Sequence, residues 1–353
     1  MNTNHTVSID RLQAFCTEAL THEGMEQAAA ETTAKVLCRT DAFGTHSHGT
    51  KNLYDYIRKM RCGGMELNGR PVLIREGPSY AAVDGRNAIG MVSATLGMET
   101  AIEKCRKTGV ACVNVTHSEH FGAAGYYAVL AAEQGLIGLS MSNVDANMTI
   151  PGARSKVLGN NPFAYALPAA AHRPVFLDVA LSAVASLKVV QARKDGVSIP
   201  AGWIVDKDGL PTTDPSHYPE EGAMLPMAAH KGYGLALMVE ALTSLLGGGA
   251  MMTQVPSWLF CLAEPNQVSH MFLCIDPECF VGADAFRARV DEAIERVHSA
   301  DRAAGCDRLY YPGEIEWERY ERAVREGVCL PDDVAASLQK LAEDTGLKAP
   351  WER

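Results

Sequence analysis

The sequence predicts an α/β protein, in which a middle region of alternating helices and strands is flanked by two helical ends. At both ends, apolar residues recur at the three- and four-residue spacing of amphipathic helices. From about Gly90 onward, short apolar runs typical of buried strands alternate with such helical stripes. A chain of 353 residues is long enough for two domains. We therefore expect the two ends (residues 1–85 and 283–353) to pack together as a helical unit, and residues 86–282 to form a sheet-containing unit.

The N-terminal region is predicted to be mostly helical. Ser8 is a suitable N-cap for the first helix, which Gly24 is expected to end. A second helix is expected over residues 26–37, and a third helix stops at Gly63-Gly64. The segment 71–83 indicates short strands before the middle region begins.

The middle region and the C-terminal end continue the same pattern. The strands expected there are residues 111–115, 136–142, 164–167, 175–179 and 271–275. The helices expected there are a stripe from Ala94 to Cys105, then residues 122–133, 233–246, 283–298, 314–326 and 331–344. The helix over 233–246 is apolar almost all round, so we expect it to be buried.

The composition is that of an ordinary globular protein, with 47% hydrophobic and 21% charged residues. The net charge of -10 argues against nucleic-acid binding, which needs concentrated lysine and arginine. No apolar run reaches the roughly 20 residues that span a bilayer, so no membrane segment is expected.

The ten cysteines do not form a disulfide pattern. Cys16, Cys38 and Cys105 fall on apolar helical faces, while Cys112 and Cys274 lie in strand-like runs. No C-x-x-C pair occurs, and the N-terminus does not resemble a signal peptide. We therefore expect buried, reduced thiols in a cytoplasmic protein.

The segment Gly44–Gly49 is a candidate acid–base site. It places Ser47 between His46 and His48, and glycines bound the group. Histidine suits proton transfer because its ordinary pKa lies close to neutral pH. A neighbouring serine hydroxyl can fix the tautomer of the ring.

A second histidine cluster, Thr116–Gly122, contains His117 and His120. It follows the strand expected over 111–115 and opens the next helix. Junctions between a strand and a helix are where α/β folds place ligands. Two histidine loops of this kind indicate one shared site.

The same histidines allow a different interpretation, a metal-dependent hydrolase or lyase. It would use His46, His48, His117 and His120. No carboxylate or cysteine completes a recognised ligand pattern such as H-E-x-x-H, so the residues favour a site without metal.

A third cluster, Ala229–Gly234, contains His230 and Lys231 at the start of an apolar helix. A lysine in this position can meet an anionic group such as a phosphate. The chain contains neither a G-x-x-x-x-G-K-[ST] phosphate loop nor a G-x-G-x-x-G turn after a strand. Nucleotide hydrolysis and a Rossmann dinucleotide site are therefore disfavoured.

These stretches, in this order, resemble the malate/L-lactate dehydrogenase family that lacks a Rossmann fold. That family includes sulfolactate, ureidoglycolate and 2,3-diketogulonate dehydrogenases and reductases of piperideine- and pyrroline-2-carboxylate. The similarity runs from about Ile9 to Gly346. Its anchors are Ser47-His48-Gly49, Tyr56, Ser118, His120-Phe121-Gly122, Gly159, Asn161-Pro162, Asp178, Ala180, Ser182, Ile199-Pro200, Gly202-Trp203, Pro211–Pro215, Lys231–Leu235 and Pro312–Glu314.

The resemblance implies a sulfolactate dehydrogenase-like fold, with a non-Rossmann NAD(P)-binding sheet domain and a helical domain made by both termini. It implies hydride transfer between NAD or NADP and a small 2-hydroxy or 2-oxo acid. By resemblance, the catalytic residues are His48, Ser47 and His120. The substrate-binding residues implied are Asn52, Tyr56 and His120.

The resemblance also implies a cofactor site and a homodimer. The implied cofactor-binding residues are His120, Asn161, Asp178, Ala180, Ser182, His230, Lys231, Gly232, Pro312, Gly313 and Glu314. The active site would lie at the subunit interface, with no bound metal.

The chain departs from the family pattern at several positions. Asn52 stands where the family commonly has an arginine, four positions after the catalytic histidine. Leu181 replaces a threonine in the segment from Asp178 to Ser182, and Leu187 replaces a glycine. The substrate and the choice between NAD and NADP therefore stay open. A reductase of a cyclic imine carboxylate, or a relative that binds a nucleotide or acid without turnover, are alternatives.

Overall fold

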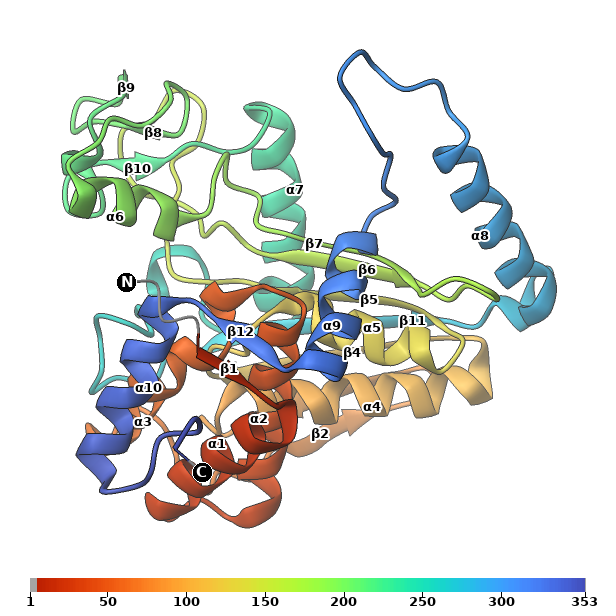
Figure 1. Ribbon diagram of the computed structural model, residues 1–353, viewed down its shortest axis with the longest axis horizontal. Helices are drawn as coiled ribbons and strands as arrows, with labels where there is room; N and C mark the ends of the chain where they lie inside the picture. The colour runs from red at the N-terminus through yellow and green to blue at the C-terminus, as the bar shows by residue number, and fades with distance from the viewer. Residues whose placement is uncertain (1–4, 353) are drawn as a thin grey trace.

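The computed structural model describes residues 5–352, and Figure 1 shows how its elements are arranged. The helices are α1 (Ile9–His22), α2 (Gln27–Ala42), α3 (Leu53–Arg61), α4 (Gly90–Thr108), α5 (Ala124–Glu133), α6 (Ser186–Asp195), α7 (His230–Glu240), α8 (Ala283–His298), α9 (Glu314–Glu326) and α10 (Asp332–Thr345). The strands are β1 (His5–Val7), β2 (Val72–Glu76), β3 (Tyr80–Asp84), β4 (Val110–Ser118), β5 (Ile137–Ser142), β6 (Phe163–Leu167), β7 (Val175–Val179), β8 (Ile204–Val205), β9 (Pro211–Thr212), β10 (Ala223–Met224), β11 (Val268–Ile275) and β12 (Val328–Leu330).

A seven-stranded sheet forms the centre, in the order β2-β3-β4-β11-β5-β6-β7. Only β3 and β4 pair in parallel, and every other neighbouring pair in this sheet is antiparallel. Two smaller sheets accompany it, β10-β8-β9 and β1-β12. The mixture of helices and sheet confirms the α/β fold class predicted from the sequence.

Helices α4 and α5 cover one face of the central sheet. α4 packs against β3, β4 and β11, and α5 packs against β5, β6 and β7. The core between these layers contains fully buried Val113, Phe272 and Ala164, one from each of three strands. Burial of such side chains supplies the main stabilisation of the layer.

The opposite face of the sheet is only partly covered. Asn114 on β4 faces this side and donates from its amide to the carbonyls of Leu242 and Thr243, which places the end of the α7 region there. Helix α8 packs on the same face through Val290 and Ile294 against Val175 of β7. The rest of this face carries partly exposed apolar side chains.

The expectation that the helix over 233–246 is buried all round is wrong for one side of it. The helix begins earlier, at His230, and its last turn, Ala241–Leu245, is a π-helix. It packs through Ala236 and Val239, while the apolar side chains of Leu235, Met238, Leu245 and Leu246 stay exposed. A helix that lies on a sheet buries only the side it turns toward that sheet.

The two ends of the chain lie together at the lower left of Figure 1. β1 pairs with β12 in antiparallel orientation, α1 contacts α10, and α2 contacts α9. β2 and β3 join the central sheet although they fall within residues 1–85, and α8 packs on that sheet although it falls within 283–353. The division into two domains at residues 86 and 282 stays a prediction.

Two features of the fold differ from the sequence expectations or were not expected. Helix α6 and the β8–β9–β10 sheet lie in a segment for which the sequence predicted no helix or strand. All ten cysteines lie within residues 5–352 and are free, but Cys62, Cys279 and Cys329 are exposed rather than buried. No helix in this range combines the length and apolar character needed to cross a membrane.

Candidate active site

The predicted site residues gather at one edge of the central sheet. From the pairing directions, β3, β4, β5 and β7 run the same way and end at this edge, where β6 and β11 begin. His120 follows the end of β4, Asn161 precedes β6, and Asp178–Ser182 covers the end of β7. The ends of the strands therefore bring together three segments that lie far apart in the sequence.

The loop that carries His48 packs against the same edge. A Cβ atom built on Gly122, just after His120, would lie 3.6 Å from the His48 carbonyl oxygen. The ring centroids of His48 and His120 are 5.7 Å apart, and the two planes differ by 30°. The structure therefore joins the two histidine clusters through these two residues.

The His48 loop is held by one buried carboxylate, that of Asp41 in α2. Its Oδ2 accepts hydrogen bonds from the Thr50 backbone N–H at 2.8 Å and from the Thr50 hydroxyl at 2.5 Å. A Cβ atom at Gly49 would lie 2.2 Å from Asp41 Oδ1, so only glycine fits this close approach. His46 also turns to this carboxylate, with Nδ1 at 2.9 Å from Oδ1. His46 therefore belongs to the support of the loop.

Ser47 and His48 form the acid–base pair that the sequence indicated. The Ser47 hydroxyl lies 2.9 Å from His48 Nδ1. When this hydroxyl donates, the neutral ring carries its proton on Nε2. Burial lowers the pKa of His48 below the ordinary value of 6.5.

His120 contacts Tyr56 and a tryptophan that sequence reasoning missed, Trp258. The Tyr56 hydroxyl is 2.6 Å from His120 Nδ1. The indole of Trp258 stacks on His120 with centroids 4.5 Å apart and planes within 12°, and lies 5.3 Å from the Tyr56 ring. Burial lowers the pKa of His120 well below its usual range, and nearby His48 and His270 lower it further.

Lys59, on the same helix as Tyr56, and Glu119, next to His120, form a buried ion pair that the sequence did not reveal. Both side chains have no exposed surface, and Lys59 Nζ lies 3.7 Å from Glu119 Oε2. Lys59 also donates to the carbonyl oxygens of Cys261 and Glu264, and Glu119 Oε1 accepts from the Asn266 N–H at 2.7 Å. Burial raises the pKa of Glu119 to about 8, against the opposing effect of Lys59.

Asn52, predicted to bind substrate, is buried beside the pair of Ser47 and His48. Its amide Nδ2 donates to the Ser47 carbonyl oxygen at 2.9 Å. The side chain therefore fixes the backbone of the catalytic loop. It does not present the positive charge that an arginine would present at this position.

The predicted cofactor residues occupy two environments. Asp178 is partly exposed and accepts from the Gly125 N–H at 2.7 Å, at the start of α5. Burial raises the pKa of Asp178 to about 6, opposed by that N–H and reinforced by Glu316. Ser182 forms a bridge with Pro226, which brings the segment after β7 beside the approach to α7.

At the start of α7, His230 and Lys231 are exposed. Gly232 is required there, because a Cβ atom would lie 2.2 Å from the Met227 carbonyl oxygen. Ala228 and Ala229 both have positive φ angles, of 46° and 53°, so the chain turns sharply into the helix. This turn presents two basic side chains next to the sheet edge.

Other predicted cofactor residues are engaged inside the protein. The buried Asn161 amide donates to Glu240 Oε2 at 2.8 Å and accepts from the Val144 N–H at 3.1 Å. The Glu314 carboxylate accepts from His298 Nε2 at 2.9 Å and from the Tyr311 N–H at 3.1 Å. Burial alone would raise the pKa of Glu314, but the hydrogen bonds outweigh it and the pKa is lowered.

Pro312 and Gly313 connect this segment to β7. The Pro312 carbonyl accepts from the Phe176 N–H at 3.0 Å. Gly313 has φ of 91°, and a Cβ atom there would lie 2.5 Å from the Phe176 ring, so the close approach needs glycine. These residues therefore lie near Asp178, two positions along β7 from Phe176.

The remaining histidines of the metal hypothesis are separated. His117 has a positive φ of 49° and its Nδ1 lies 3.1 Å from Asp84 Oδ1 on the exposed surface. Within residues 5–352, no group of three or more histidine, cysteine, aspartate or glutamate side chains is placed to hold a metal ion.

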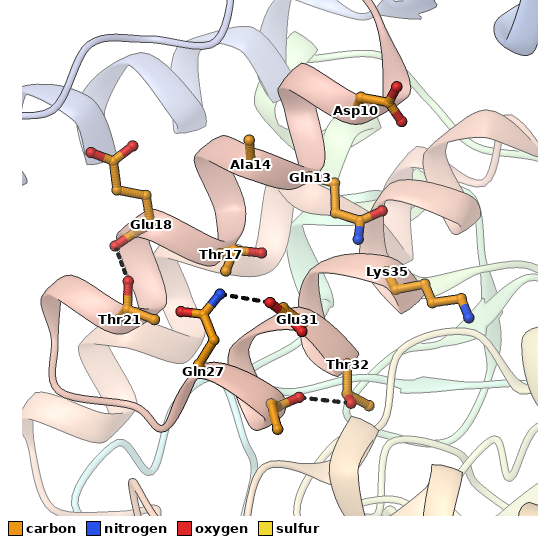
Figure 2. Close-up of a pocket in the computed structure, with 11 residues that line it drawn as sticks. Asp10, Gln13, Ala14, Thr17, Glu18, Thr21, Gln27, Glu31, Thr32 and Lys35 are labelled. Atoms are coloured by element: carbon orange, nitrogen blue, oxygen red, sulfur yellow. Dashed lines mark hydrogen bonds between the residues drawn. The ribbon is translucent and has the colours of Figure 1, made fainter.

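A polar groove between α1 and α2, shown in Figure 2, lies apart from this site. Its walls include Asp10, Thr17 and Lys35, and Gln27 donates to Glu31 within α2 at 2.7 Å. It contains none of the predicted catalytic, substrate or cofactor residues.

Comparisons with known proteins cover almost the whole chain. One family model, described as Malate/L-lactate dehydrogenase, matches residues 7–339. The malate dehydrogenase of Pyrococcus horikoshii is 34% identical over 346 residues, covering 96% of this chain and 95% of that protein. The L-sulfolactate dehydrogenase of Methanocaldococcus jannaschii is 35% identical over 327 residues, with 92% of each chain covered.

A solved structure agrees with these matches. The sulfolactate dehydrogenase structure from Methanocaldococcus jannaschii is similar with a TM-score of 0.90 at 32% identity, covering 98% of each chain. The Ureidoglycolate dehydrogenase (NAD(+)) of Escherichia coli K12 is 33% identical over 328 residues, covering 93% of each chain. The matches confirm the resemblance that the motifs indicated.

Proposed function

This chain belongs to the malate/L-lactate dehydrogenase family, and from that premise we propose that it transfers a hydride between NAD or NADP and a small 2-hydroxy or 2-oxo acid. The observation that carries the proposal is the Ser47–His48 pair, stacked beside His120 at the edge where the strands end. When bound, NAD or NADP supplies or accepts the hydride, so the protein has to provide one proton and a fixed orientation for the substrate.

His48 is the proposed general acid and base. With the Ser47 hydroxyl donating to Nδ1, the neutral ring holds a proton on Nε2 and can give it to a substrate oxygen during reduction. In the opposite direction the neutral base form takes the proton of the hydroxyl group. The lowered pKa keeps His48 in that base form down to acidic pH.

His120 is proposed to orient the substrate. Burial raises the pKa of Tyr56 far above its usual range, so the phenol keeps its proton and donates to His120 Nδ1. The neutral His120 ring then carries a proton on Nε2, where it can donate a hydrogen bond to a substrate oxygen. Tyr56 thus acts on the substrate through His120.

The residues at the start of α7 fit a pyridine dinucleotide. Lys231 and His230 are exposed basic side chains at the positive end of a helix, which suits the phosphates of NAD or NADP. A Cβ atom at Gly234 would have no neighbour within 4 Å, so open space lies beside this turn. We assign Asp178, Ala180 and Ser182 to the same site, because the Ser182–Pro226 bridge brings their segment to the approach of α7.

Asn161, Gly232 and the Pro312–Glu314 segment are proposed to shape the cofactor site from behind. Asn161 donates to Glu240 of α7, and Gly232 allows the close approach of α7 to the Met227 carbonyl. The Pro312–Glu314 segment contacts Phe176 of β7. A change at these positions should therefore weaken cofactor binding through the fold.

We also propose a homodimer that uses the partly covered face of the sheet, opposite α4 and α5. Strand register places one residue from each of six strands in a single row on this face: Tyr80, Cys112, Leu273, Leu139, Tyr165 and Leu177. Tyr80 is 46% exposed and the others are partly exposed. Together with the exposed side of α7, this face is the kind of continuous apolar surface that subunit interfaces bury.

The proposed function is tested by assaying a panel of 2-oxo acids and cyclic imine carboxylates with NADH and NADPH. Turnover of at least one of them is expected, and failure of both cofactors to bind at millimolar concentration would contradict the proposal. The dimer is tested by measuring the mass of Leu246→Asp in solution. We expect that variant to be monomeric and the Glu103→Lys control to remain dimeric, whereas a wild-type monomer would refute the dimer.

A further inference from the structure

An aromatic loop forms one wall of the candidate active site. This loop, Pro256–Asn266, is here called the Trp258 loop. Its indole covers His120 at 4.5 Å and contacts the ring of Tyr56 at 5.3 Å, so two aromatic faces lie directly beside the proposed substrate-orienting histidine. Aromatic faces recognise flat or apolar groups through their large contact area.

The Trp258 loop is fixed at both ends and in the middle. Asn266 donates from its backbone N–H to Glu119 Oε1 and from its amide to the Pro256 carbonyl at 2.5 Å, which closes the base of the loop. Lys59 binds the carbonyl oxygens of Cys261 and Glu264. The wall is therefore preorganised and does not depend on substrate to order it.

This wall presents no positive charge in the part of the chain that the structure describes. Lys59, the cation on the neighbouring helix, is fully buried and faces Glu119 and two loop carbonyls. Asn52 is neutral, and its amide is bound to Ser47. A carboxylate, that of Asp145, contacts the loop through the side chain of Ser257, next to Trp258.

We propose that Trp258 selects substrates with a single carboxylate and an uncharged apolar side chain, and rejects substrates whose side chain carries a second anionic group. This inference rests on the proposed hydride transfer and names the substrate class for the same site. Burying an anion without a charged or hydrogen-bonding partner is strongly unfavourable. An apolar side chain of the substrate gives up no hydrogen bond when it packs against the indole, and its transfer out of water is favourable.

The test is a comparison of kcat/KM for reduction with matched acids. The apolar arm uses phenylpyruvate, 4-methyl-2-oxopentanoate and the cyclic imine piperideine-2-carboxylate, and the anionic arm uses oxaloacetate and sulfopyruvate. We expect the best apolar substrate to exceed both dianions by at least about 10-fold, as the cost of an unpaired buried charge implies. Within the apolar arm, the ratio of imine to oxo acid tells which reacting group is preferred.

Equal or higher kcat/KM with oxaloacetate or sulfopyruvate would overturn the inference while leaving the proposed function standing. Turnover of none of the five acids would instead overturn the proposed function, and the inference with it.

Three variants of the Trp258 loop test whether Trp258 sets the substrate preference. Trp258→Arg introduces a cation where the indole lies, and should shift the ratio of dianion to apolar kcat/KM toward the dianion by about 10-fold or more. Phe260→Ala is the matched control, because Phe260 belongs to the same loop but is 71% exposed, and its ratio should equal wild type. Trp258→Leu, with its Tm measured alongside, keeps the wall neutral and should retain the preference for apolar acids. An unchanged ratio in a folded Trp258→Arg protein would contradict the assignment.

Discussion

Two loops meet at the candidate active site, and they are held in opposite ways. The His48 loop is anchored by Asp41, which lies nine positions from Thr50 in the sequence. The Trp258 loop is anchored by Lys59, which lies 202 positions from Cys261, and by Glu119, which lies 147 positions from Asn266. The site therefore joins two differently supported loops. The His48 loop supplies the proton and is held by a residue nearby in the sequence. The Trp258 loop shapes the pocket and is held by residues far away in the sequence.

The largest effect is expected from removing the proposed general acid and base in the His48 loop. His48→Ala should lower kcat by about 100- to 10,000-fold, because a positioned general acid or base contributes that much. Binding of NAD(P)H, followed by its fluorescence, should stay near wild type. His117→Ala is the matched control, since His117 pairs with Asp84 at the surface and should leave kcat unchanged. Near wild-type turnover in His48→Ala would remove this residue from the mechanism.

The next largest effect is expected at Lys59, which holds the Trp258 loop from a distant part of the sequence. Above about pH 8, where Glu119 is ionised in the folded protein, Lys59→Met leaves this buried carboxylate without its cation, and should reduce the free energy of unfolding by about 3–5 kcal/mol. The double variant Lys59→Met with Glu119→Gln removes the stranded charge, so it should recover most of that loss. Denaturant unfolding of the wild type and of these two variants measures both changes in the free energy of unfolding. A double variant as unstable as the single one would show that the carbonyl contacts of Lys59, rather than the ion pair, hold the loop.

A smaller effect is expected at the local anchor. Asp41→Asn keeps the shape of the side chain but turns one acceptor into a donor, which should cost about 1–3 kcal/mol of unfolding free energy. The damage should be confined to the His48 loop, so kcat should fall while cofactor binding persists. If Asp41→Asn destabilises the protein more than Lys59→Met does, the contrast between a local and a long-range anchor is wrong.

The smallest effect is a shift in a pH profile. Burial lowers the pKa of His48, so the base form survives below the ordinary histidine value of 6.5. The kcat/KM for oxidation of a 2-hydroxy acid should therefore stay level as pH falls to about 6.5 and decline only at lower pH. A decline already centred above pH 7 would show that another group, or a His48 with a raised pKa, controls the step.

The same contrast explains how much the sequence could predict. Ser47 and His48 were predicted because they lie within one short pattern, Tyr56 was implied by the family resemblance, and the spacing of apolar residues indicated most helices and strands. Trp258, Lys59 and Glu119 were missed because their roles depend on pairings across the fold. A lysine in an amphipathic helix normally points to water, so nothing local marks Lys59 as buried.

Other gaps have similar physical causes. Asp41 carries a weak local signal, since it is an aspartate in a helix eight positions before Gly49, yet its burial follows only from the folded loop. The helix that begins at His230 looked fully buried because its apolar pattern does not distinguish a helix buried on all sides from one that lies on a sheet with its outer side exposed.

The central claim is that His48 exchanges a proton with the reacting oxygen of a 2-oxo acid beside the Trp258 wall. A crystal structure with NAD or NADP and an unreactive 2-oxo acid analogue such as oxamate tests it most directly. The account predicts the analogue oxygen at roughly 2.6–3.2 Å from His48 Nε2, with the rest of the analogue facing Trp258. An analogue bound with its reacting oxygen away from His48, next to another side chain, would contradict it.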